Sequence, residues 1–346
     1  MADFRTAGPD ASDPARHQPN YDRAVPRSED RRRSRGAASG YRGPGIRVRV
    51  PAKINLHLAV GDRRLDGYHE LMTLFHSVSV YDTVTVTPAA RLTLKVTGEG
   101  AAGVPTDHAN LAWQAATSLA ELHDLDPNVL IEIHKSIPVA AGMAGGSADA
   151  AATLVGCDAL WGLHTSRGGL TELAADLGSD VAFSLHGGNA IGTGRGETLS
   201  PVLVAHDQLW WVLALAHGGL STPAVYTELD RQRAASDAPA AGTDPLAPPI
   251  ELLRALRDQD VHAVAAALRN DLQPAALALN PSLRATLDAG LMLGAMGALV
   301  SGSGPTCAFL VTDADSARTV ASRLTREKVC RTTRVAAGPT HGAQLC

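Results

Sequence analysis

The stretch from Pro138 to Ala152, PVAAGMAGGSADAAA, connects a strand-like apolar segment to a helix-like segment of small residues. Gly142, Gly145 and Gly146 allow the backbone to adopt positive φ values and to approach a ligand closely. The free N–H groups of the following helix, predicted to begin at Ser147, attract anions. The stretch therefore predicts a phosphate-binding loop, although a tight strand-to-helix turn would show the same glycines.

Two common phosphate-binding patterns do not fit this loop. The Walker pattern G-x-x-x-x-G-K-[ST] is absent, because no Gly-Lys pair occurs in the chain. The dinucleotide-binding pattern G-x-G-x-x-G does not fit the loop either. Elsewhere in the chain, the segment GTGRGE at 192–197 has alternating glycines like those of a dinucleotide-binding turn. It follows GGNAI in a predicted hairpin, whereas a dinucleotide site needs a strand, a turn and a helix. An oxidoreductase that uses a nicotinamide cofactor is therefore disfavoured.

Composition indicates a globular protein of ordinary character. The 346 residues are enough for two domains, and four cysteines without a CxxC pair support neither a zinc site nor a disulfide framework. The first 20 residues lack the apolar core of a secretory signal, and no apolar stretch predicts a membrane span. A reduced, cytoplasmic setting fits best. The net charge of −4 argues against nucleic acid as a partner.

The chain is expected to become ordered near Ile46. Residues 1–45 are rich in Arg, Pro and Ser and are predicted to be a disordered tail, whose Arg31–Arg33 run is either solvated or in contact with nucleic acid. The segment 46–60 predicts two strands broken at Pro51, because proline cannot donate to a sheet. Residues 231–249 look like a flexible connection.

Apolar periodicity predicts the remaining elements and an α+β architecture. Strands are expected at 71–88, 91–98, 129–138, 209–219 and 329–337, and 296–313 should form a strand, a glycine turn and a strand. Helices are expected at 110–122, 148–163, 171–177, 250–258, 260–270, 281–293 and 314–326.

Three motifs together resemble the signatures of the GHMP kinases. They are PAKINL at 51–56, the loop at 138–152, and SGSGPT at 301–306, in the order that the family shows. The resemblance runs from about residue 46 to 336. It implies an N-terminal domain like the second domain of ribosomal protein S5, at 46–205, and a ferredoxin-like C-terminal domain at 206–340. The active site would lie between them, and 341–346 would be a tail.

The resemblance also implies an ATP site. Mg²⁺ is expected on the ATP phosphates, where Ser147 could touch it, since no carboxylate cluster marks a protein site for the ion. Asp149 lies one turn into the phosphate-binding helix and could face metal, a lysine or solvent. The residues expected to bind ATP are Pro138, Gly142, Met143, Ala144, Gly145, Gly146, Ser147 and Ala148, with Asn110 on the adenine side.

Asp180 and Lys53 are the candidate catalytic pair. Asp180 follows a predicted helix in LGSDVAF, which resembles the family's catalytic aspartate segment, although an aspartate here could simply cap a helix. Lys53 lies in the PAKINL motif and would favour the ionised carboxylate and polarise the acceptor oxygen. Outside this motif, a lone lysine on a strand is usually solvated. Asn55 would point to the same strand face as Lys53 and could bind substrate or be structural.

The segment DGYHEL at 66–71 resembles one branch of the family, in which the acceptor is a cytidine diphosphate ester of methylerythritol. The resemblance implies ATP-dependent transfer to the acceptor's 2-hydroxyl, in the non-mevalonate isoprenoid route. Tyr68 would stack on the cytosine, His69 would bind its edge, and Tyr226 would supply the opposite aromatic ring. Thr222 would contact the acceptor's phosphates or sugar.

Two other classes of protein remain open. Another GHMP kinase, acting on a mevalonate-type compound or homoserine, would share the three motifs but is not similar at DGYHEL. A non-enzymatic RNA-binding protein could share the S5-like fold. The chain's acidic body opposes that second alternative. We expect a monomer or weak homodimer that acts on a small molecule, with neither nucleic acid nor membrane as partner.

Overall fold

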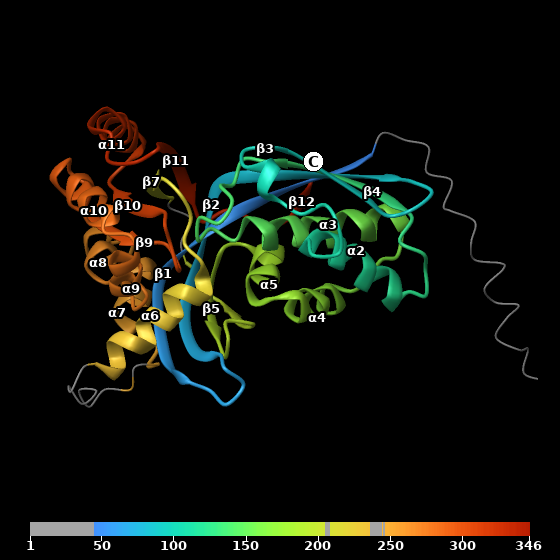
Figure 1. Cartoon of the computed structure of the whole chain (residues 1–346), viewed down its shortest axis with the longest axis horizontal. Coiled ribbons are helices and arrows are strands. Elements are labelled where there is room, and N and C mark those ends of the chain that lie inside the picture. Colours follow the sequence, from blue (N-terminus) through green and yellow to red (C-terminus); the bar gives the residue numbers. More distant parts are fainter. Residues whose placement is uncertain (1–44, 205–207, 236–243, 245) are drawn as a thin grey trace, which may run out of the picture. The chain divides into compact units, whose positions relative to one another are not determined.

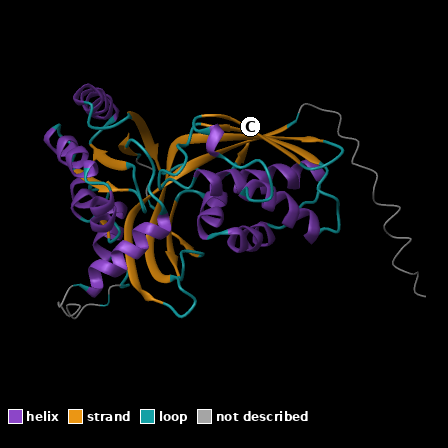
Figure 2. Cartoon of the chain, viewed as in Figure 1, coloured by secondary structure: helices purple, strands orange, loops and turns teal. Residues whose placement is uncertain are grey.

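The computed structural model describes residues 45–204, 208–235, 244 and 246–346, and these form two β-sheets with helices packed against them (Figure 1). The predicted Arg-rich tail at 1–45 lies outside the described residues, apart from Gly45. Runs of strands and runs of helices follow one another along the chain, and Figures 1 and 2 together show that α2 to α5 gather at one sheet and α7 to α11 at the other.

The first sheet is built on a long antiparallel hairpin of β1 (Ile46–Arg63) and β2 (His69–Pro88). Its strand order is β12-β1-β2-β4-β3, while β5 pairs with β2, β6 with β5 and β8 with β1. The other strands are β3 (Thr93–Gly98), β4 (Val129–Lys135), β5 (Asn189–Thr193), β6 (Thr198–Pro201), β8 (Arg269–Asn270) and β12 (Gln344–Leu345). The segment at 192–197 thus lies in a hairpin, as predicted.

β1 does not break at Pro51, contrary to the prediction. The pairing register with β2 shifts between Pro51 and Ala52, so an irregularity in the ladder accommodates the residue that cannot donate a hydrogen bond. Further shifts occur between Asn55 and His57 and between Val60 and Arg63. The hairpin therefore continues across the molecule and carries Lys53 into its interior.

The helix that follows the glycine loop is the centre of the first packing layer. This helix, α3 (Gly145–Trp161), packs against β1 and β2 and is buried along most of its length because its residues are small. A Cβ added to Gly156 would lie 3.1 Å from a Val86 methyl carbon. Around α3 pack α2 (Leu111–Leu122), α4 (Arg167–Leu177) and α5 (Ser179–His186). α3 begins at Gly145, earlier than predicted, and α5 was not predicted.

The second sheet has the order β11-β7-β10-β9, with every neighbouring pair antiparallel. Its strands are β7 (Leu209–Leu215), β9 (Gly297–Val300), β10 (Cys307–Val311) and β11 (Thr332–Gly338), and α10 (Ser282–Met292) and α11 (Ala314–Glu327) pack on it. This is the ferredoxin-like arrangement. The predicted α+β class is therefore confirmed.

Two further helices and one further strand differ from the predictions. α6 (Thr222–Ala234) covers the start of the expected flexible connection, of which 236–243 and 245 lie outside the described residues. α9 (Gln273–Leu279) was not predicted. The expected tail at 341–346 contains β12, which pairs with β1 through Val48 and Arg49. The remaining elements are α7 (Ile250–Arg257), α8 (Val261–Ala266) and the 3-10 turn at Ala101–Gly103.

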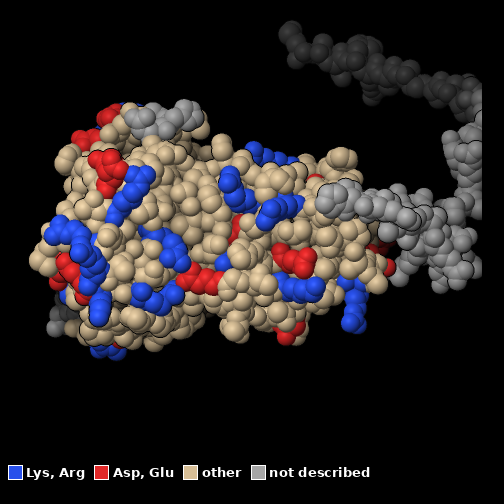
Figure 3. All heavy atoms as spheres, turned by 90° about the horizontal axis from the view of Figure 1, so that it is seen from above, with Lys and Arg blue, Asp and Glu red and all other residues tan. Residues whose placement is uncertain are grey.

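Charges of both signs are interspersed on the face of the molecule in Figure 3, where neither sign gathers into one large patch. Within the part of the chain that the structure describes, no helix combines the length and the apolar character needed to cross a bilayer.

A buried histidine links the two sheets. Trp211 on β7 donates through Nε1 to His76 Nε2 at 3.1 Å, and His76 Nδ1 lies 2.6 Å from Asn189 Oδ1. Because an indole N–H can only donate, His76 must accept at Nε2 and carry its proton on Nδ1. Burial lowers the pKa of His76 to about 4, although the hydrogen bond to Asn189 opposes the shift.

The lowered pKa of His76 predicts that acid destabilises the protein before its carboxylates are extensively protonated. Below the ordinary histidine pKa of 6.5 the unfolded chain binds a proton on His76, whereas the folded chain does so only near pH 4. The free energy of unfolding should therefore fall by up to about 1.4 kcal/mol per pH unit for this group over that window. Urea denaturation between pH 7.5 and 4.5 measures it. The His76→Leu variant should show a shallower dependence on pH, and equal slopes would refute the assignment.

Candidate active site

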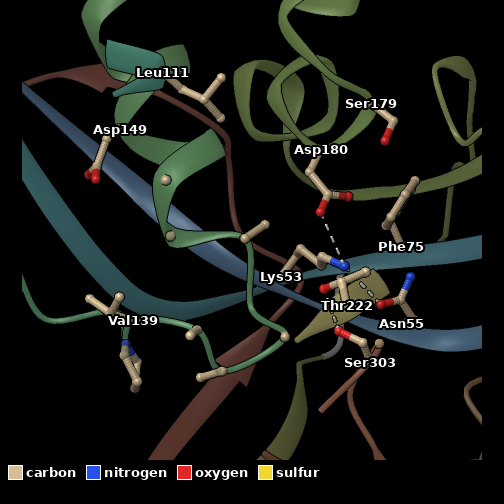
Figure 4. Close-up of a pocket in the computed structure, with 18 of the residues that line it drawn as sticks. Lys53, Asn55, Phe75, Leu111, Val139, Asp149, Ser179, Asp180, Thr222 and Ser303 are labelled. Carbon is tan, nitrogen blue, oxygen red and sulfur yellow. Dashed lines mark hydrogen bonds and ion pairs between the residues drawn. The ribbon is translucent and has the colours of Figure 1, made fainter. Parts of the chain in front are cut away.

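A cavity of about 520 Å³ lies where the glycine loop, the β1–β2 hairpin and the glycine turn at 301–306 meet. One side is lined by residues of the segments 103–111 and 138–149. The other is lined by Lys53, Asn55, Asp180, Arg195, Thr222 and Tyr226. Figure 4 shows Asp149 and Val139 on one side of the glycine loop and Lys53 and Asp180 on the other. The cavity therefore has two halves that meet near the loop.

The glycine loop has the geometry of an anion cradle. Gly145 and Gly146 are the first residues of α3, so their N–H groups and that of Ser147 have no acceptor within the helix. A Cβ added to Gly146 would meet no atom within 4 Å, so this backbone faces open space. Gly142 has a φ of 73°, and a Cβ there would lie 2.3 Å from the Ser301 carbonyl oxygen. Any side chain at that position would push the loop away from the 301–306 turn.

Lys53 and Asp180 meet at the junction of the two halves. Lys53 Nζ lies 3.5 Å from Asp180 Oδ2 and donates to Asn55 Oδ1 at 2.9 Å (Figure 4). Asn55 in turn donates to Thr73 Oγ1 at 2.8 Å, which fixes its amide. The Lys53 side chain is 8% exposed and that of Asp180 is 31% exposed. The ammonium group is thus held by buried partners, while the carboxylate can be reached from the cavity.

Helix α6 and the 301–306 turn close the same side of the cavity. Thr222 begins α6, and its hydroxyl lies 2.8 Å from Ser303 Oγ. Ser301 Oγ donates to the Gly142 carbonyl at 3.0 Å, which joins the turn to the glycine loop. These contacts bring the start of α6, the 301–306 turn and the glycine loop together at one wall of the cavity, although the three segments are far apart in sequence.

The predicted aromatic sandwich is arranged differently from the expectation. His69 stacks on Tyr226 with ring centroids 5.0 Å apart, and its Nε2 lies 2.8 Å from Asp230 Oδ1. Tyr68 is 54% exposed and lies under the Arg195 guanidinium, 4.1 Å from the ring centroid. Tyr226 therefore lines the cavity, and neither Tyr68 nor His69 does. Burial, with a contribution from Asp180, raises the pKa of Tyr226 to about 12.

The other half of the cavity suits a flat apolar group. Val104, Pro105, Leu111, Pro138 and Val139 line it. Asn110 lines it too, but its side chain accepts from Ala112 N and donates to Pro105 O, both at 2.8 Å. Its amide is therefore engaged in capping α2, as its sequence position also allowed.

Beneath the glycine loop, Lys135 is buried between two carboxylates. Its Nζ donates to Asp149 Oδ2 at 2.6 Å, to Asp82 Oδ2, and to the Gly145 carbonyl at 3.1 Å. Asp82 Oδ1 also accepts from the amides of Ser136 and Ile137, at 2.6 and 2.8 Å. Asp149 thus faces a lysine, one of the three surroundings that the sequence left open.

Burial and pairing shift the pKa values of Lys135 and Asp149 in this cluster. Burial raises the pKa of Asp149 well above its usual value, although Lys135 opposes the shift. Burial also disfavours charge on Lys135, but Asp149 and Asp82 outweigh it and raise the pKa of the lysine. The cluster therefore holds one ammonium between two carboxylates in a site that is nearly closed to solvent.

The structure brings together most of the residues singled out in the sequence. Among the predicted catalytic, acceptor and ATP residues, those lining the cavity are Lys53, Asp180, Asn55, Thr222, Tyr226, Pro138, Gly142, Ala144, Gly145, Gly146 and Asn110. Those outside the lining are Met143, Ser147, Ala148, Tyr68 and His69. Sequence reasoning missed Lys135, Asp82 and Arg195 as neighbours of the site. The scarcity of lysine, with four in the chain, was the one signal that pointed toward Lys135.

Two family models match parts of the chain. The model described as "GHMP kinases N terminal domain" matches residues 110–188, and the one described as "GHMP kinases C terminal" matches 252–329. The 4-diphosphocytidyl-2-C-methyl-D-erythritol kinase of Rhodococcus jostii is 58% identical over 298 residues, 86% of this chain and 94% of that protein. The chain belongs to the GHMP kinases. It is an ATP-dependent kinase.

Other relatives of this GHMP kinase carry the same name. That of Mycolicibacterium smegmatis is 53% identical over 93% of this chain and 98% of its own length. A crystal structure of 4-(cytidine 5'-diphospho)-2C-methyl-D-erythritol kinase superposes with a TM-score of 0.68 at 32% identity, over 84% of this chain and 98% of that one. Homoserine kinase from Cytophaga hutchinsonii, with a TM-score of 0.70 at 18% identity over 88% and 98% of the two chains, shares the fold.

Proposed function

We propose that this GHMP kinase transfers the γ-phosphoryl group of ATP to the 2-hydroxyl of 4-diphosphocytidyl-2-C-methyl-D-erythritol, in non-mevalonate isoprenoid precursor synthesis. The observation that carries the proposal is the two-sided cavity, in which an anion cradle and an aromatic-lined half meet at Lys53 and Asp180. Relatives at 53–58% identity bear the name of this activity. We further propose that the enzyme acts in the cytoplasm as a monomer or weak homodimer.

In this proposal the glycine loop binds the ATP phosphates and the apolar half holds the adenine. The N–H groups of Gly145, Gly146 and Ser147 would donate to phosphate oxygens, and the dipole of α3 adds to their attraction. Mg²⁺, carried on the ATP phosphates, would neutralise part of their charge. The described residues hold no group of three or more His, Cys, Asp or Glu that could bind the ion on its own.

Lys53 and Asp180 would act on the acceptor hydroxyl. Asp180 would accept the hydroxyl proton as the oxygen attacks the γ-phosphorus, since its carboxylate is exposed to the cavity. Lys53 lies 3.5 Å away and would stabilise the negative charge that develops on the transferring group. Asn55 holds Lys53 from the buried side, so the ammonium need not reorganise during the reaction.

An acceptor panel tests the proposal. The protein is incubated with Mg-ATP and, separately, the cytidylyl methylerythritol, mevalonate and homoserine, and ADP formation is followed with mass analysis of the products. We expect phosphorylation of the cytidylyl compound with a kcat/KM at least about 10³-fold above the others, because these lack the cytidine diphosphate. Phosphorylation of mevalonate but not of the cytidylyl compound would overturn the substrate assignment.

Tyr226→Ala is expected to raise the KM for the cytidylyl acceptor about tenfold or more, since base stacking on an aromatic ring contributes roughly 1–3 kcal/mol. The KM for ATP should change less than about twofold, because Tyr226 lies on the acceptor side of the cavity. Steady-state kinetics with each substrate varied in turn measures both. Tyr226→Phe is the matched control and should resemble the wild type. Equal effects of Tyr226→Ala on the two KM values would count against a cytosine contact.

A further inference from the structure

Arg195 lies at the tip of the β5–β6 hairpin and lines the acceptor side of the cavity. It belongs to the GTGRGE segment, whose alternating glycines resemble those of a dinucleotide-binding turn but lie in a hairpin, as predicted. Gly194 and Gly196, on either side of it, have φ values of 72° and 99°. The Gly194 carbonyl accepts from Leu71 N at 2.7 Å, which attaches the tip to β2. The hairpin therefore presents Arg195 from a defined backbone position.

Three cations line the cavity, and two of them already have carboxylate partners. Lys53 lies beside Asp180, and Lys135 lies between two buried aspartates. Within the described residues, no carboxylate oxygen lies within 4.0 Å of the Arg195 guanidinium. Glu197, two residues along, accepts instead from the backbone N–H of Arg195 at 2.6 Å. Arg195 is thus the cavity cation that is available to an anion.

The contact that Arg195 does make leaves its hydrogen-bonding edge free. Its guanidinium lies over the face of Tyr68, 4.1 Å from the ring centroid. Stacking uses the flat face of a guanidinium, whereas its N–H groups point outward in the plane. A guanidinium held in this way can still donate two parallel hydrogen bonds to phosphate oxygens.

The proposed acceptor supplies an anion that needs such a partner. Its diphosphate connects the cytidine to the methylerythritol, and so lies between the base near Tyr226 and the reacting hydroxyl near Asp180. Both of these residues line the same side of the cavity as Arg195. We propose that Arg195 binds the diphosphate of the acceptor, with Tyr68 as the platform that orients its guanidinium. This inference rests on the proposed function.

Binding of CDP and of cytidine separates the phosphate contact from the base contact. The full-length protein is saturated with Mg²⁺ and a non-hydrolysable ATP analogue, so that CDP cannot occupy the glycine loop, and binding is measured by titration calorimetry. The wild type should bind CDP about tenfold or more tightly than cytidine. Arg195→Gln should bind the two alike, and Arg195→Lys should retain part of the preference, because it keeps the charge without the bidentate edge.

Kinetics supplies a second readout and a matched control. Arg195→Gln should raise the KM for the cytidylyl acceptor about tenfold or more, with the KM for ATP changed less than about twofold. Arg64→Gln should change neither, since Arg64 is exposed, pairs with Asp66 and Glu70 and does not line the cavity.

The outcomes distinguish this inference from the proposed function. A wild type that phosphorylates the cytidylyl acceptor, with an Arg195→Gln variant that keeps the preference for CDP, would overturn the role of Arg195 alone. An Arg195→Gln variant with a lower kcat or a higher KM for ATP, but an unchanged KM for the cytidylyl acceptor, would also overturn it. A wild type that neither binds CDP nor phosphorylates the acceptor would overturn the proposed function, and this inference with it.

Discussion

Asp180→Asn is expected to lower kcat by about 10²- to 10⁴-fold, the range that positioned proton transfer contributes. Asparagine preserves the size of the side chain but can neither accept the hydroxyl proton nor pair with Lys53. The KM for ATP should change little, because the glycine loop lies apart from this carboxylate (Figure 4). Rapid-quench or coupled steady-state assays measure kcat, and thermal unfolding followed by circular dichroism verifies that the variant is folded.

Three companion variants sharpen this test. Asp176→Asn, an exposed aspartate on the preceding helix, should leave kcat unchanged and controls for general charge effects. Lys53→Ala should lose a comparable amount of turnover. The double variant of Lys53 and Asp180 should lose little more than either single one, because residues that act as a unit are not additive. A folded Asp180→Asn variant with kcat within about threefold of the wild type would contradict the proposed role.

Lys135→Met is expected to have the largest effect on stability, a loss of about 3–5 kcal/mol in the free energy of unfolding. Removing the ammonium leaves Asp82 without its cation in a site where both carboxylates are nearly inaccessible to solvent. It also removes the donor to the Gly145 carbonyl, so the start of α3 loses a constraint. Urea denaturation at pH 7 measures the change.

Lys95→Met is the matched control for this stability prediction. Lys95 on β3 lies 3.5 Å from Glu132, but both side chains are largely exposed, so the loss should stay under about 1 kcal/mol. Asp149→Asn should also cost less than Lys135→Met, because Lys135 keeps Asp82 as its partner. A Lys135→Met variant no less stable than Lys95→Met would show that the buried cluster does not stabilise the fold.

Sequence reasoning was most successful where chemistry lies in contiguous motifs. The glycine loop, PAKINL and SGSGPT could each be read locally, and the structure places Gly142 against Ser301 as close packing of two such motifs requires. Lys53 and Asp180 are 3.5 Å apart although 127 positions separate their numbers, and only the family resemblance connected them. Their catalytic roles stay predictions.

The missed features depend on contacts between distant segments. Lys135 ends an alternating strand on the same face as Ile131 and Ile133, but the strand's own sequence does not indicate that Asp82 and Asp149 surround it. Helix α6 was missed because its sequence is mostly polar, with Val225 and Leu229 as its buried residues. Period-two and period-3.6 patterns report burial against one face and carry no information about which segment covers it. The same limit explains why β12 was predicted as a tail.

The aromatic residues show a third limit, since residue type predicts a stack but not its partners. The sequence suggested Tyr68 and Tyr226 around a base, whereas the structure stacks His69 on Tyr226 and Arg195 on Tyr68. His69 is adjacent to Tyr68 in sequence but stacks on Tyr226, and the local sequence does not indicate which side chain will contact which ring.

The position of the transferred phosphate tests the central claim most directly. The enzyme is incubated with Mg-ATP and 4-diphosphocytidyl-2-C-methyl-D-erythritol, and the product is analysed by phosphorus NMR with correlation to carbon. We predict one new phosphate monoester on the oxygen of C2, with the diphosphate intact and one ADP formed for each product. A phosphate on another hydroxyl, or ADP release without a phosphorylated product, would contradict the account.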